Sequence, residues 1–231
     1  MIEQNIAAIR AKMDEAALAC GRDPKDILLC AATKMNDAEA VKRAVAGGVD
    51  CCGENRVQEL VQKQPLGAYE GKPVHFIGHL QTNKVKYLVG KADLIHSVDS
   101  AHLAEEIARQ SSRQNVITPI LVQVNAGREE AKSGIYPEEA PEFLARIAEM
   151  PSLSLRGMMV VAPICEEKDA VRKYFQESYR IFIDFFAKNK HNIEDPVLSM
   201  GMSDTFAEAI LEGATLVRVG SALFGARNYQ L

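Results

Sequence analysis

Short apolar segments alternate with longer amphipathic segments along the chain, and this alternation predicts the secondary structure. The apolar segments have the length of buried strands, and the segments between them carry the periodicity of helices. Strands are expected at 27–33, 49–55, 74–78, 92–98, 118–126, 155–163, 196–201 and 214–220. Helices are expected at 1–17, 37–48, 56–65, 82–90, 100–114, 136–150, 166–190 and 203–213. Ser100 is expected to cap one helix, and Pro137 to lie in the first turn of another.

Regular alternation of strands and helices predicts a parallel sheet, and about eight such units favour a closed (β/α)8 TIM barrel. An open doubly wound sheet is the alternative. No GxGxxG follows the first expected strand, so the dinucleotide fingerprint of that alternative is absent. No linker, repeat or low-complexity stretch interrupts the pattern, and residues 1–231 are therefore expected to form one domain.

Composition and charge limit the classes of partner that the chain is expected to bind. The net charge is -4 and no block of Lys or Arg occurs, which argues against nucleic acid or a membrane surface as a partner. No apolar run approaches the roughly 18 residues of a membrane span, and the acidic amphipathic N-terminus is unlike a signal peptide. A small anion needs only a few donors and stays possible. The size of any assembly is left open, between a monomer and a weak dimer.

The five cysteines show no CxxC or CxxH spacing and are odd in number. A disulfide framework or a zinc site is therefore not expected, no metal site is predicted, and a reducing cytoplasm fits best. Cys51 and Cys52 could form a redox pair, but small residues packed in a buried strand are the preferred interpretation. His75 and His79 straddle a strand end rather than sharing a helix face, so His75 is expected to be a hydrogen-bonded core residue.

Functional side chains of a barrel enzyme gather where the strands end. Lys34 follows the first strand directly, and it shares a face with Leu28, Cys30 and Ala32. If that face is the barrel interior, small residues leave room for a flat ligand. Partial desolvation would lower the lysine pKa and make Lys34 a candidate for Schiff-base formation. The alternative is a lysine that extends into solvent from a strand end.

Two glycine–serine turns follow the last two expected strands. SMGMSD (199–204) places Gly201 between serines just before a helix, and GSALFG (220–225) does the same after the final strand. Both loops commonly bind phosphate in this fold, because backbone N–H groups at a helix start suit an anion. Arg218, on the last strand, would need a buried acceptor if it points inward. That acceptor could be a ring nitrogen, an anion or an internal acid.

A lysine nucleophile, a phosphate cup and an arginine suggest pyridoxal 5'-phosphate, and here the chain resembles the YggS/PROSC family of pyridoxal phosphate homeostasis proteins. The motifs that carry the resemblance are AATKMND (31–37), GENRVQE (53–59), HFIGHLQTNK (75–84), KSGI (132–135), SMGMSD (199–204) and GATLVRVGSALFGARNY (213–229). It implies a barrel like the alanine racemase N-terminal domain. It also implies that Lys34 forms an imine with the cofactor, and that Arg218 faces the pyridine nitrogen with Asn55 nearby. The implied phosphate residues are Ser199, Met200, Gly201, Ser203, Gly220 and Ser221.

Two departures from the family pattern lie near the mouth: Val74 replaces a frequent aromatic residue, and Met35-Asn36-Asp37 replaces a TKP-like run. Arginine beside the pyridine nitrogen discourages its protonation, which weakens the ring as an electron sink and suits a carrier. Related racemases share that arginine.

The preferred function is a non-catalytic carrier that stores, buffers or delivers pyridoxal 5'-phosphate, with apo-enzymes that use the cofactor as possible recipients. The alternative is an amino-acid racemase. Its second acid–base group would come from an additional domain for which the residues after Gly220 leave no room. A lysine-dependent aldolase is a third hypothesis, disfavoured because its lysine is expected on a later strand.

Overall fold

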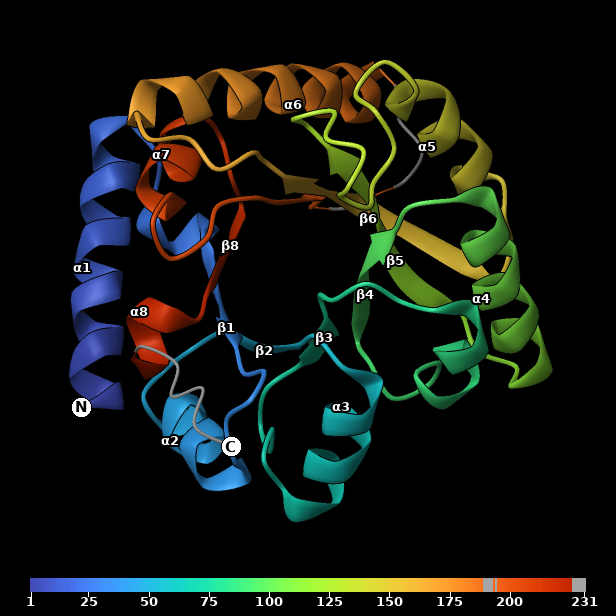
Figure 1. Cartoon of the computed structure of the whole chain (residues 1–231), viewed down its shortest axis with the longest axis horizontal. Helices are drawn as coiled ribbons and strands as arrows, with labels where there is room; N and C mark the ends of the chain where they lie inside the picture. Colours follow the sequence, from blue (N-terminus) through green and yellow to red (C-terminus); the bar gives the residue numbers. More distant parts are fainter. Residues whose placement is uncertain (189–192, 194, 226–231) are drawn as a thin grey trace.

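The computed structural model describes residues 1–188, 193 and 195–225, and its eight strands form a closed parallel barrel in chain order (Figure 1). The barrel and its alternating helices confirm the predicted fold. The strands are β1 (Leu28–Ala32), β2 (Cys51–Glu54), β3 (Val74–Phe76), β4 (Leu94–Val98), β5 (Thr118–Asn125), β6 (Leu153–Val161), β7 (Val197–Ser199) and β8 (Leu216–Val219). β1 pairs with β8, which closes the ring.

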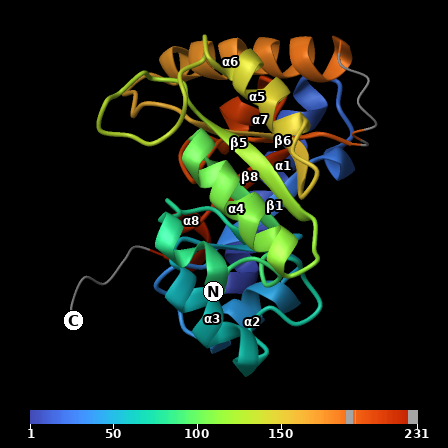
Figure 2. The same cartoon turned by 90° about the vertical axis from the view of Figure 1, so that its right-hand side faces the viewer.

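Helices surround the barrel on the outside (Figures 1 and 2). They are α1 (Ile2–Ala19), α2 (Ala38–Ala46), α3 (Val57–Lys63), α4 (Ala101–Arg113), α5 (Ala140–Ala148), α6 (Lys168–Lys188), α7 (Phe206–Leu211) and α8 (Ser221–Phe224). Three short 3-10 helices complete the set: η1 (Pro24–Asp26), η2 (Gln64–Leu66) and η3 (Thr82–Tyr87). No helix within the described ranges is long and apolar enough to cross a membrane.

Most predicted helices occur, with two differences. Segment 82–90 was expected to be an α-helix but forms the 3-10 helix η3. Helix α5 begins at Ala140, so Pro137 lies in the preceding turn and Pro141 occupies the first helical turn. The end of the expected 166–190 helix and residues 226–229 of the last motif lie partly outside the described residues. Ser100 does cap α4, since its hydroxyl accepts the N–H of Leu103.

Successive side chains along each strand point alternately out of the barrel and into it, which produces an outer and an inner apolar layer. In β1, Leu29 and Ala31 join the large core between the strands and the helices, whereas Cys30 joins a small interior cluster with Cys51 and Leu216. The interior is thus filled with side chains rather than hollow, as in other barrels of this type. Cys52 belongs to the outer core while Cys51 faces inward, so these neighbours point to opposite faces of β2 and the packing interpretation holds.

Close strand contact in the barrel wall depends on Gly157 in β6. Its φ is +143°, and a Cβ atom there would lie within van der Waals overlap of the Val197 backbone carbonyl. Only glycine fits both the conformation and the space. This position sets the approach of β6 to β7, the strand that leads into the Ser199–Asp204 loop.

Candidate functional site

A cavity of about 260 Å³ opens where the strands end. Residues that follow β1, β2, β7 and β8 contribute to its wall. The lining consists of Ala32, Lys34, Asn55, Ile77, Met159, Val161, Met202, Ser203, Asp204, Arg218, Gly220 and Ser221. The structure therefore brings together six of the predicted site residues: Lys34, Asn55, Ser203, Arg218, Gly220 and Ser221.

Lys34 lies half-buried at the cavity wall, directly beyond Ala32 on the inward face of β1. The backbone on either side of it is held from α3. Lys63 Nζ donates to the carbonyl of Thr33 at 2.9 Å, and Glu59 Oε2 accepts the N–H of Met35 at 2.7 Å. Met35 has a φ of +62°, a conformation that few side chains adopt without external support. The two bonds thus orient the turn that carries Lys34.

A buried polar cluster behind β2 holds Lys63 in position to support this turn. The contacts within this cluster were not predicted from the sequence. Glu54 Oε1 accepts hydrogen bonds from Thr33 Oγ1 at 2.6 Å, Lys63 Nζ at 2.8 Å and Tyr69 Oη at 2.9 Å. Glu54 is fully buried, so a paired ammonium group offsets much of its desolvation. Burial, with the Glu54 carboxylate beside it, raises the pKa of Tyr69 and keeps that phenol protonated.

Asn55 lines the same cavity and carries an unsatisfied acceptor. Its Oδ1 is buried and has no hydrogen-bond partner among the described residues. Buried polar atoms in native proteins almost always have partners, so this oxygen calls for a donor that a ligand can bring. Backbone packing fixes the residue, because a Cβ atom on Gly78 would overlap the carbonyl of Asn55.

Ser203 organises the loops after β7 and β8. Its Oγ accepts the backbone N–H groups of Gly220 at 3.2 Å and Ala222 at 3.3 Å, at the start of α8. A Cβ atom on Gly220 would come 3.3 Å from the Ala32 Cβ, so glycine keeps this wall open. Ser203, Gly220 and Ser221 therefore present hydroxyl and N–H groups on one side of the cavity. These residues follow β7 and β8, whereas Lys34 follows β1.

Ser199, Met200 and Gly201 are not among the lining residues. The Met200 side chain is buried in the outer core, and its N–H donates to the carbonyl of Leu216. Gly201, with a φ of +89°, passes so close to the Ala209 Cβ that a side chain would have no room. These residues shape the loop, and their contact with a phosphate stays a prediction.

Arg218 points into the barrel interior and forms part of the cavity floor. Its Nη1 donates to the Ser199 carbonyl at 2.8 Å and to Ser199 Oγ at 2.6 Å, and its Nη2 donates to the Val160 carbonyl at 3.0 Å. No carboxylate within the described ranges forms an ion pair with Arg218. Burial lowers its pKa to about 10, which still leaves the guanidinium charged at neutral pH. The alternative of an internal salt bridge is therefore wrong.

Two histidines extend this hydrogen-bonded chain across the interior. His96 Nδ1 lies 3.1 Å from Ser199 Oγ, and His96 Nε2 lies 3.0 Å from His75 Nδ1. Burial lowers the pKa of His75 to about 4 and that of His96 well below its usual value, so both rings are neutral. His75 is the hydrogen-bonded core histidine that was expected. The role of His96 was missed, because its partners come from distant strands.

Several lining residues were not predicted as site residues, although some lie within the quoted motifs. Ile77, Met159 and Val161 supply apolar surface, and Met202 and Asp204 belong to the loop after β7. Among the described residues that line the cavity, the ionisable side chains are Lys34, Asp204 and Arg218. Such a site offers one amine, one carboxylate and one buried cation around an apolar floor.

Comparison with known proteins relates this architecture to others. Residues 2–228 match the family described as alanine racemase, N-terminal domain. The pyridoxal phosphate homeostasis protein of Aquifex aeolicus is 38% identical over 226 residues, which cover 98% of each chain. PipY of Synechococcus elongatus, solved with pyridoxal 5'-phosphate bound, is 30% identical, with a TM-score of 0.83 and coverage of 97% and 100%. Alanine racemase of Clostridium difficile shares the fold at 16% identity and a TM-score of 0.71, and the match spans 57% of that enzyme.

Proposed function

The chain belongs to the pyridoxal phosphate homeostasis family, whose barrel is that of the alanine racemase N-terminal domain, and we propose that it binds pyridoxal 5'-phosphate and acts in the intracellular homeostasis of that cofactor. The observation that carries the proposal is the convergence of Lys34, Asn55, Ser203 and Arg218 on one cavity. When bound, the cofactor supplies an aldehyde that a lysine can attack and an electron-withdrawing ring.

Lys34 is proposed to hold the cofactor covalently, as an imine between its Nζ and the aldehyde carbon, with loss of water. Its place on the cavity wall supports this role, as does the bracing of its backbone from α3. The unpartnered Asn55 Oδ1 is suited to accept a hydrogen bond from the cofactor side of the cavity. Ile77, Met159 and Val161 offer the apolar surface that an aromatic ring prefers.

The phosphate is proposed to bind at Ser203, Gly220 and Ser221, with Ser199, Met200 and Gly201 shaping that loop. Ser203 Oγ already accepts the N–H groups of Gly220 and Ala222, which orients its own O–H, and an anion beside it would meet the hydroxyl donors of Ser203 and Ser221. Arg218, on the cavity floor, is proposed to face the pyridine nitrogen. Its positive charge disfavours protonation of that nitrogen.

A carrier role without robust turnover is the preferred function. Racemisation by two bases requires acid–base groups on both faces of the bound ring. Within the described lining, Asp204 is the one carboxylate, and it belongs to the same loop as Ser203. The fold shared with alanine racemase favours amino-acid racemisation as the second candidate. Apo-enzymes as recipients, a cytoplasmic location, and a monomer or weak dimer all stay predictions.

The covalent assignment is tested by reduction with borohydride. Purified protein loaded with the cofactor should be yellow, and reduction followed by peptide mapping should place the label on Lys34. Lys34→Ala should lose the imine absorbance, whereas the exposed control Lys42→Ala on α2 should keep it. Full imine absorbance in Lys34→Ala would contradict the assignment.

Transfer experiments separate the two candidate functions. A carrier should pass the cofactor to an apo-enzyme faster than it releases the cofactor into buffer, while a buffering reservoir would show equal rates. Robust amino-acid racemisation that disappears in Lys34→Ala would favour the racemase.

A further inference from the structure

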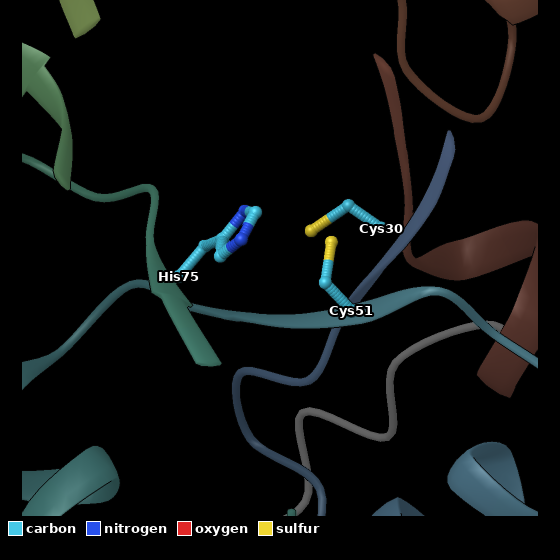
Figure 3. A group of neighbouring side chains, drawn as sticks. All are labelled: Cys30, Cys51 and His75. Carbon is cyan, nitrogen blue, oxygen red and sulfur yellow. The ribbon is translucent and has the colours of Figure 1, made fainter. Parts of the chain in front are cut away.

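Three soft metal ligands converge inside the barrel, one layer below the cavity (Figure 3). They come from neighbouring strands: Cys30 from β1, Cys51 from β2 and His75 from β3. The two Sγ atoms and a ring nitrogen of His75 all lie within 4.8 Å of one another, and all three residues are buried. No spacing motif signals this cluster, because each ligand comes from a different strand.

Strand register brings the three groups together across adjacent strands. Cys30 and Cys51 are directly paired between β1 and β2, and His75 pairs with Gly53, the next inward position of β2. A Cβ atom on Gly53 would approach Cys30 Sγ to 2.8 Å, so glycine provides the space that this sulfur occupies. Ala32, the next inward residue of β1 above Cys30, lines the cavity. The cluster therefore lies one inward position below the cavity floor, measured along β1.

The spacing suits a tetrahedral metal ion. Bond lengths of about 2.3 Å to sulfur and about 2.0–2.1 Å to nitrogen imply ligand atoms roughly 3.5–3.8 Å apart. The observed limit of 4.8 Å allows this geometry after small side-chain rotations. His75 Nδ1 lies 3.0 Å from His96, which leaves Nε2 as the nitrogen for a metal. A hydrogen-bonded second nitrogen is the usual way in which proteins orient a metal-bound histidine.

The surroundings balance the charge of two thiolates. Leu216 and Val197 pack against the cysteines, so the cluster is shielded from water on that side. Arg218 pairs in register with Cys30 and carries a positive charge at the same level. A divalent ion with two thiolates is neutral, and thiolate with imidazole is a ligand set that selects zinc over magnesium or calcium.

We propose that Cys30, Cys51 and His75 form a binding site for a zinc-class divalent cation beneath the cofactor cavity. Binding replaces the two thiol protons, which leave to solvent, and forms two metal–sulfur bonds and one metal–nitrogen bond. A fourth coordination position is open to water, as in zinc sites with three protein ligands.

Metal binding also sets the direction of the hydrogen-bonded chain to Arg218. With Nε2 on the metal, neutral His75 carries its proton on Nδ1 and donates to His96 Nε2. His96 then carries its proton on Nδ1 and donates to Ser199 Oγ, which also accepts from Arg218. A continuous chain of hydrogen bonds therefore connects the metal ligand His75 to Arg218 on the cavity floor.

Cadmium titration of the full chain tests the site, with the protein stripped by chelator and kept reduced. One Cd²⁺ per chain should bind and produce a thiolate-to-metal charge-transfer band in the ultraviolet. Cys30→Ser and Cys51→Ser should each abolish the band, and His75→Gln should weaken binding by about 10-fold or more. The matched control is Cys52→Ser, since Cys52 is equally buried on the opposite face of β2.

The second control is the double variant Cys20→Ser with Cys165→Ser, since both cysteines are partly exposed. This variant should keep the charge-transfer band. A band that disappears in this control, or no band in wild-type protein at one equivalent, overturns the proposal. If the buried serine variants fail to fold, X-ray absorption of the zinc-loaded wild type decides. Two sulfur neighbours at about 2.3 Å with a nitrogen shell support the site, whereas oxygen and nitrogen neighbours alone contradict it.

Discussion

Glu59 Oε2 accepts the backbone N–H of Met35 at 2.7 Å, and this bond ties helix α3 to the residue that follows Lys34. The same oxygen accepts from Lys63 Nζ at 2.9 Å, and Lys63 in turn holds the carbonyl of Thr33. The lysine at the cavity is therefore framed on both sides by one helix. Because Met35 has a positive φ, the frame stabilises a backbone turn that a methionine would not adopt by itself.

Glu59→Ala should loosen this turn. The substitution removes the acceptor of Met35 and one partner of the largely buried Lys63, and we expect a loss of about 1–3 kcal/mol in the free energy of unfolding. Cofactor affinity should fall by about 10-fold, since Lys34 would sample other orientations. Urea unfolding and absorbance titration measure the two effects. Glu39→Ala, an exposed acid on α2, is the control, and equal cofactor affinity in both variants would argue against the frame.

Ser199→Ala should alter the environment of the bound ring more than the amount bound. Arg218 would lose one of its acceptors and His96 its hydroxyl partner, at a cost of about 1–2 kcal/mol in stability. The absorbance maximum of the loaded protein should shift, because Arg218 would no longer be held rigidly. Ser178→Ala is the matched control, since that buried hydroxyl donates to the Tyr174 carbonyl within α6. Identical spectra of the two variants would contradict the role given to Ser199.

Ser203→Ala should weaken binding of the phosphate group specifically. The hydroxyl gathers two backbone N–H groups at the start of α8, and its removal should reduce affinity for pyridoxal 5'-phosphate by about 10-fold, or about 1.4 kcal/mol. Inorganic phosphate should become a poorer competitor, whereas pyridoxal without phosphate should bind as before. Isothermal titration with the three compounds provides the comparison. An equal loss of affinity for pyridoxal would show that Ser203 does not act on the phosphate group specifically.

Gly78→Ala should displace Asn55 in the cavity wall, although Gly78 itself is not a lining residue. A Cβ atom there would overlap the Asn55 carbonyl, so the chain between β2 and its helix must move. We expect at least a tenfold loss of cofactor affinity. Gly21→Ala is the control for backbone strain: its φ is +75° in open space, so it should cost about 1 kcal/mol of stability and leave the cofactor unaffected. Normal binding by Gly78→Ala would show that Asn55 is dispensable.

The barrel and the inward face of β1 could be predicted from alternation, because strand parity fixes which side chains share a face. Lys34 followed from its place at a strand end and Arg218 from its place on the last strand, whereas Asn55 was implied by the family resemblance. The bracing by Glu54, Glu59 and Lys63 could not be predicted, since it depends on how α3 packs against β1. No metal site was predicted either, because Cys30, Cys51 and His75 meet through register between three strands, which no spacing along the chain reveals.

The seam between β1 and β8 carries a consequence for biosynthesis. Lys34 follows β1 and Arg218 lies on β8, so the amine and the guanidinium come from opposite ends of the chain. Contacts of such large sequence separation form late in folding. A nascent chain on the ribosome thus has its lysine long before it has a pocket. The proposed cofactor site is therefore complete only after β8 has paired with β1.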